Sequence, residues 1–157
     1  MAYESELMSL AARYPERLHV HIGYSEELAH QIEAGADMFI MPSRFEPCGL
    51  NQMYSLRYGT PPIVSNTGGL VDTVVNVSLK TLQNVAATGF VVPATNSESL
   101  YTTILSALDL YQNKKLWRQL CRTAMQQEVG WEVSAREYQK LYLAQVEAKQ
   151  RLMQNNE

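Results

Sequence analysis

The chemistry that this sequence suggests is concentrated in a loop, RFEPCG, that runs from Arg44 to Gly49. Gly49 stands directly before an expected helix, and the first backbone N–H groups of a helix have no acceptor within it. Together with the helix dipole these groups suit a phosphate or diphosphate, and a glycine lets the ligand reach the backbone. The groups belong to Gly49, Leu50 and Asn51. A plain turn from loop to helix is the simpler alternative, and the residue types leave both open.

Two side chains of the loop could take part in chemistry. Glu46 could aim its carboxylate at a polar substrate such as a sugar, although composition alone favours an exposed Glu46 paired with Arg44. A glycosidase would need two facing carboxylates, and no partner for Glu46 is evident, which weakens a hydrolase. Cys48 could be a nucleophile, but no histidine lies near it in sequence to form a Cys–His pair.

Further residues could contribute to a site. Tyr24 is expected just beyond a strand end, where its ring could stack on a nucleobase, although a tyrosine there is more often a packing residue. Gly68 and Gly69 predict a tight turn, which matters for function only if it meets the same crevice as the loop. His19 and His21 share one strand face, but no third ligand lies near in sequence, so we expect no metal site.

The loop is expected to lie between a strand and a helix. Asp37–Met41 is a compact apolar run, typical of a buried strand, and a helix is predicted from about Leu50 to Tyr58. Gly59 closes that helix as a C-terminal cap, and the prolines that follow prevent it from restarting. In an open α/β sheet, ligands bind beyond the carboxyl ends of the strands, so this loop should line the site.

The rest of the pattern alternates strands and helices, which indicates an α/β fold with helices packed on a parallel sheet. Further strands are predicted at Leu18–Ile22, Ile63–Val64 and Phe90–Val92. The total is about four, as if the strands that begin such a sheet were missing. Leu70–Lys80 is ambiguous between strand and short helix.

Helices are expected at both ends of the chain. One covers Glu4–Tyr14, and another follows Ser25, its N-cap. Asn96 or Ser97 caps the first of three C-terminal helices, and the last is expected at Glu132–Met153. Aromatic residues recur along these C-terminal helices and are expected in the core: Trp117, Trp131, Tyr138 and Tyr142.

Composition excludes several classes of function. A chain of 157 residues is one domain by default, and a net charge of −3 argues against a nucleic-acid partner held through phosphates. No apolar run approaches the roughly 20 residues that span a bilayer, and no signal peptide is visible at the N-terminus. Cys48 and Cys121 are far apart in sequence, so free thiols in a reducing cytoplasm are expected.

Taken as a whole, the segment Pro42–Val74, PSRFEPCGLNQMYSLRYGTPPIVSNTGGLVDTV, resembles bacterial glycogen synthases and plant starch synthases. The resemblance continues upstream in GYSEELAHQIEAGADMFIMPS, and downstream in TGF and GWEVSAREYQKLY. These enzymes are retaining glycosyltransferases of the GT-B fold, in which two Rossmann-like domains face a cleft. The resemblance implies that residues 1–130 are part of the C-terminal Rossmann-like domain and that residues 131–157 are the closing helix and tail.

The family transfers glucose from ADP-glucose to the non-reducing end of an α-1,4-glucan such as glycogen, with retention and without a metal or cofactor. By position, Glu46 matches the active-site glutamate that contacts the donor glucose. Tyr24 matches the tyrosine that stacks on adenine, and Arg44 is counted with the donor-binding residues. The resemblance assigns the loop and the turn that border the donor pocket to Cys48, Gly49, Leu50, Thr67, Gly68 and Gly69.

Some family features are not in this sequence. Tyr54 stands where many related transferases have a second glutamate, as is usual in the glycogen synthase branch. The RLxxQKG and KxGGL segments are absent, so the chain looks like the last third of a synthase.

Two hypotheses follow: it carries part of the donor site of a glucosyltransferase, or it is an inert nucleotide-sugar-binding or folding unit. We expect negligible catalysis by this chain alone, and an unpaired sheet edge makes self-association plausible.

Overall fold

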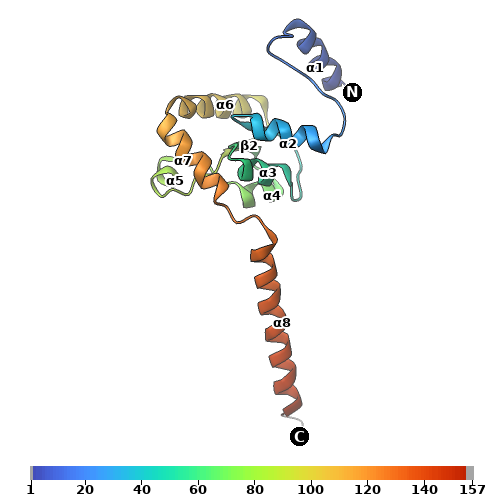
Figure 1. Cartoon of the computed structure of the whole chain (residues 1–157), viewed down its shortest axis with the longest axis vertical. Helices are drawn as coiled ribbons and strands as arrows, with labels where there is room; N and C mark the ends of the chain where they lie inside the picture. Colours follow the sequence, from blue (N-terminus) through green and yellow to red (C-terminus); the bar gives the residue numbers. More distant parts are fainter. Residues whose placement is uncertain (1, 155–157) are drawn as a thin grey trace. The chain divides into compact units, whose positions relative to one another are not determined.

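The computed structural model describes residues 2–154, and it divides between Ile32 and Glu33 into two compact units. The first unit holds α1 (Ala2–Arg13) and the start of α2 (Glu26–Gly35), and the second holds every later element (Figure 1). The predicted division into residues 1–130 and 131–157 stays a prediction, and its last three residues lie outside the described range.

The first unit confirms two predicted helices and corrects one strand. Ser25 caps α2 as expected, since its Oγ accepts the backbone N–H of Leu28 at 3.3 Å. The strand predicted at Leu18–Ile22 is wrong, because this segment has no regular structure. Alternating apolar residues make a strand only where a neighbouring strand supplies hydrogen bonds, and this segment pairs with none in the described chain.

The second unit is built on a parallel sheet in which chain order and spatial order agree, β1-β2-β3. These strands are β1 (Phe39–Met41), β2 (Pro62–Ser65) and β3 (Phe90–Val92). The register pairs Ile40 with Ile63, and Val64 with Val91. The Rossmann-like α/β class is confirmed, but residues 2–154 contain three strands rather than about four. Self-association through a sheet edge stays a prediction.

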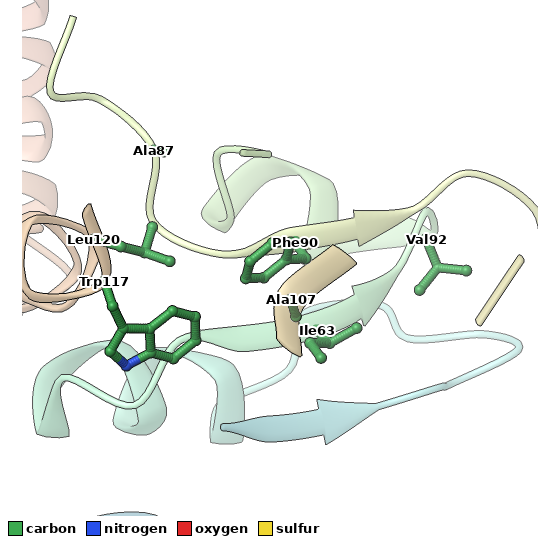
Figure 2. Packing of buried hydrophobic residues seen from close by; sticks show 7 residues of the cluster. All are labelled: Ile63, Ala87, Phe90, Val92, Ala107, Trp117 and Leu120. Carbon is green, nitrogen blue, oxygen red and sulfur yellow. The ribbon is translucent and has the colours of Figure 1, made fainter. Parts of the chain in front are cut away.

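One face of the sheet is covered by α6 (Ser97–Gln112) and α7 (Lys114–Met125). Figure 2 shows Ile63, Phe90 and Val92 of the sheet together with Trp117 of α7 in this core. Phe90 and Trp117 are stacked with ring centroids 6.4 Å apart. Trp117 therefore occupies the core, as its sequence position predicts.

The opposite face is covered by a short helix, α4 (Gly68–Thr73). Its Leu70 is fully buried and packs with Val64 of the sheet and with Val74. The segment Leu70–Lys80, ambiguous in the sequence, begins inside α4 and ends inside a second short helix, α5 (Leu79–Gln83). Between the two helices Asn76 forms an isolated parallel bridge with Gly89, so neither a strand nor a single helix covers the segment. Gly68 and Gly69 form the first turn of α4, so the isolated tight turn predicted there is corrected to a helix start.

The helix that follows the loop, α3 (Asn51–Tyr58), ends as predicted. Gly59 adopts the left-handed conformation at φ +74° and its N–H donates to carbonyls of the last turn. The next residue, Thr60, is buried, and its hydroxyl donates to the Glu33 carbonyl at 2.7 Å. These contacts fix the C-terminal end of α3 and leave its N-terminal end facing the loop.

The start of α6 gives a prediction of modest size. Asn96 is the N-cap, and its Oδ1 accepts the Ser99 N–H at 2.8 Å. Asn96→Ala is expected to lower the free energy of unfolding by about 1 kcal/mol, measured by urea denaturation, because that N–H loses its acceptor. Gln112→Ala at the exposed end of the same helix is the control. Equal losses in the two variants would contradict the capping role.

The last helix, α8 (Trp131–Gln154), confirms the predicted secondary structure but not the predicted burial. Trp131 is 83% exposed, and Tyr138 and Tyr142 are also exposed, so the expectation that these residues are core is wrong. An apolar stripe at helical spacing shows that a helix has one apolar face, not that a described element covers it. Among the described residues, none of the helices is both long and apolar enough to cross a membrane.

Candidate functional site

The site lies at the edge of the sheet where the parallel strands end. Met41, Ser65 and Val92 are the last residues of β1, β2 and β3, so the three loops that follow begin at one edge. A pocket of about 160 Å³ opens there, lined by residues that include Arg44 and the buried Ser65. The pocket lies where a ligand crevice is expected in such a sheet, but among the described residues Arg44 is the one predicted site residue that lines it.

Backbone contacts between the loop and the start of α4 require two glycines. Gly68 has φ +45°, and a Cβ there would overlap the carbonyl oxygen of Glu46. A Cβ at Gly69 would lie 2.5 Å from the carbonyl oxygen of Cys48. The Gly69 N–H donates to the Glu46 carbonyl at 3.2 Å. The double glycine therefore packs directly against the loop, and its place at the border of a donor pocket stays a prediction.

The start of α3 presents unpaired backbone donors beside this junction. Leu50 is the N-cap and offers no side-chain acceptor, and Gly49 precedes it at φ +72°. In the part of the chain that the structure describes, the N–H groups of Gly49, Leu50 and Asn51 donate to no acceptor. Gly49 is one residue further from the helix than predicted, but the same three N–H groups are unpaired within the described chain, and their binding of a phosphate or diphosphate stays a prediction.

Glu46 is half-buried and has a partner other than the one composition favoured. Its Oε2 accepts a hydrogen bond from the Ser43 hydroxyl at 3.3 Å. Among the described residues it forms no ion pair with Arg44, whose side chain lines the pocket beyond the strand ends. The Glu46 side chain is therefore held by a neutral hydroxyl rather than by a cation.

The other predicted site residues are placed as follows. Tyr24 is 91% exposed and belongs to the first unit, so its contact with adenine stays a prediction. Thr67 is the N-cap of α4, without a side-chain cap bond, and the Leu50 side chain is exposed. Within residues 2–154 no group of three or more His, Cys, Asp or Glu side chains is arranged to hold a metal ion.

The two cysteines differ in environment, which gives a direct test of the loop's accessibility. Cys48 is exposed, whereas burial raises the pKa of the Cys121 thiol above its ordinary value. Because the thiolate is the reactive form, a thiol reagent at a pH of about 8 should modify Cys48 at least about tenfold faster than Cys121. Cys48→Ser should remove the fast phase, followed by mass spectrometry. Equal rates would contradict an exposed loop cysteine.

Sequence reasoning missed one residue of this site. Gln52 is fully buried in the first turn of α3, and its side-chain amide contacts the carbonyls of both Cys48 and Gly49. The available signal was its spacing, since a glutamine three residues after Gly49 lies on the face of the helix that looks back at the loop.

Comparison with known proteins identifies the class to which this fold and site belong. Residues 2–124 match the family described as Glycosyl transferases group 1. Since this match covers most of the chain, the chain belongs to that family.

Within the family, the chain is similar to bacterial glycogen synthases. It is 55% identical over 144 residues to the glycogen synthase of Hydrogenovibrio crunogenus, covering 92% of this chain and 29% of that protein. It is 52% identical over 139 residues to the glycogen synthase of Dechloromonas aromatica, covering 88% and 29%. The chain thus spans under a third of the length of these relatives, and the resemblance noted in its motifs is confirmed.

Two solved structures of glycosyl-transferring enzymes are also similar to this chain. The catalytic domain of starch synthase IV from Arabidopsis thaliana, bound to ADP and acarbose, matches with a TM-score of 0.76 and 33% identity over 91% of this chain and 30% of that one. Sucrose-phosphate synthase from Thermosynechococcus elongatus matches with a TM-score of 0.65 and 25% identity over 94% and 35%. Both likenesses support a Rossmann-like domain of the GT-B type.

Proposed function

We propose that this chain forms the donor-binding side of a glucosyltransferase that extends an α-1,4-glucan such as glycogen from ADP-glucose, with retention of configuration. The observation that carries the proposal is the junction of the loop, the start of α3 and the double glycine at one sheet edge. The names of the relatives and the ADP bound to the starch synthase structure support the donor and the acceptor.

In this proposal each group has a separate task. The N–H groups of Gly49, Leu50 and Asn51 receive the diphosphate, on which negative charge grows as its bond to glucose breaks. Glu46 contacts the donor glucose, and Arg44 adds positive charge at the same edge. Tyr24 stacks on the adenine, and Thr67, Gly68 and Gly69 border the pocket. Two free thiols support a cytoplasmic location.

The transfer reaction can be tested in a chimera. The chain replaces the matching region of the Hydrogenovibrio crunogenus glycogen synthase, and incorporation of labelled glucose into glycogen is measured. We expect incorporation from ADP-glucose, little from UDP-glucose, and α-linked product. A folded chimera that binds ADP but uses neither donor would overturn the transferase proposal. Equal use of both donors would overturn the donor assignment alone.

The chain alone separates the proposal from its alternative, a folding unit without a ligand. Calorimetric titration with ADP is expected to show weak binding, because the unpaired N–H groups at the start of α3, which we propose receive the diphosphate, lie within this chain. We expect no measurable glucose incorporation, because the RLxxQKG segment that supplies the basic phosphate clamp in the family is not in this sequence. Absence of ADP binding would favour the folding unit.

A further inference from the structure

We propose that Gln52 is the positioning residue of the donor loop, the segment Arg44–Gly49. The side-chain amide of Gln52 fixes Cys48 and Gly49 so that the start of α3 faces a diphosphate. This inference rests on the proposed donor-binding function, and it goes further by assigning the shape of the loop to one side chain. Gln52 itself contacts no ligand in this proposal.

The contacts of Gln52 join the loop to a second helix. Its Nε2 lies 3.1 Å from the carbonyl oxygen of Cys48, 3.1 Å from that of Gly49 and 3.1 Å from Oγ1 of Thr73. An amide NH₂ has two hydrogens, so these three acceptors share them. Two acceptors belong to the loop and one to α4, and the side chain is fully buried. Gln52 therefore holds the loop against α4.

The α4 end of this connection is itself anchored. The Thr73 hydroxyl donates to the Gly69 carbonyl at 2.8 Å, which leaves its oxygen free to accept from Gln52. Gly69 in turn donates to the loop at Glu46. The loop, α4 and the first turn of α3 are thus linked in a closed series of hydrogen bonds through Gln52.

The oxygen of the same amide, Oε1, indicates that Gln52 does more than stabilise the fold. Among the described residues, Gln52 Oε1 is buried and has no hydrogen-bond partner. It faces Gly49, where a Cβ would overlap it and would lie 2.9 Å from Nε2. A buried acceptor without a donor costs free energy, so an apolar side chain of similar size would avoid that cost. The glutamine is explained by what its Nε2 does to the loop.

The test replaces Gln52 with methionine in the full 157-residue chain. Gln119→Met is the matched control, because Gln119 also donates to a carbonyl, that of Leu82 at 2.7 Å, and lies on α7. Hydrogen exchange is followed at the N–H groups of Gly69 and Met53, which donate to Glu46 and Leu50. ADP affinity is measured by calorimetry at a temperature at which every variant is folded.

For Gln52→Met we expect exchange at both N–H groups to become roughly tenfold faster and ADP affinity to fall by a similar factor, with little change in the control. Unchanged exchange, or equal changes in both variants, would overturn the proposal. If the unsubstituted chain does not bind ADP, the donor function fails and exchange alone decides the role of Gln52. If Gln52→Met does not fold, Thr73→Val should give a smaller acceleration at Met53, because Thr73 is hydrogen-bonded to Gln52 but, among the described residues, to neither Met53 nor its acceptor Leu50, and no acceleration there would overturn the proposal.

Discussion

Replacing Gly68 with alanine is expected to lower the free energy of unfolding by about 3 kcal/mol and to displace the donor loop. The backbone at Gly68 lies in the left-handed region at φ +45°, where an alanine is strained, and the added Cβ would overlap the Glu46 carbonyl. Backbone atoms cannot move aside as a flexible side chain can. Urea denaturation measures the loss, and ADP titration reports the displaced loop.

Gly35→Ala is the matched control for this prediction. A Cβ at Gly35 would meet no atom within 4 Å, and its φ is not in the left-handed region. Alanine at the end of α2 should therefore leave stability unchanged or raise it slightly. A similar loss in both variants would show that the contact between Gly68 and the loop is unimportant.

Replacing Glu46 with glutamine is expected to lower glucose incorporation by the chimera by about 100-fold or more, with stability changed by less than about 0.5 kcal/mol. Glutamine has the same shape and can still accept the hydrogen bond from Ser43, so the substitution removes the charge alone. The loss should appear at saturating ADP-glucose, because a charge that matters most in the transition state lowers kcat.

Glu98→Gln serves as the control for Glu46. Glu98 is an exposed carboxylate in the first turn of α6, which also begins at the carboxyl edge of the sheet. Its replacement changes net charge by the same amount but should leave the transfer rate nearly unchanged. If the Glu46 variant kept full activity, its assignment as the active-site glutamate would be wrong.

Sequence predicted most accurately the features that depend on neighbouring residues. The caps at Ser25 and Gly59 are found, and of the two candidates Asn96 and Ser97 the cap is Asn96, because cap chemistry acts within one turn of a helix. The α/β class was equally accessible, since alternating strands and helices define it. The loop between β1 and α3 could be placed at the carboxyl edge of the sheet, because in such a fold each loop that follows a strand begins at that edge.

Features that depend on distant partners were not predictable. The pattern at Leu18–Ile22 is compatible with a strand, but pairing decides whether one forms, and the described residues provide no partner. The apolar stripe of α8 indicates a helix but cannot say what covers it. Likewise, two consecutive glycines predict a backbone conformation or a close approach that other residues do not allow. Only the fold shows that the backbone at Gly69 lies against Cys48.

The order of the strands has a consequence for how the site forms. The loop after β1 and the turn that begins α4 belong to successive βα units, so only α3 and β2 separate them in the chain. Bringing together segments so near in sequence costs little loop-closure entropy. The junction of the loop with α4 should therefore form early in folding, before the C-terminal helices dock. Pulse-labelled hydrogen exchange should find the Gly69 N–H protected before the fluorescence of Trp117, followed in a Trp131→Phe variant, reaches its native value, because burial of Trp117 against Phe90 reports the docking of α7.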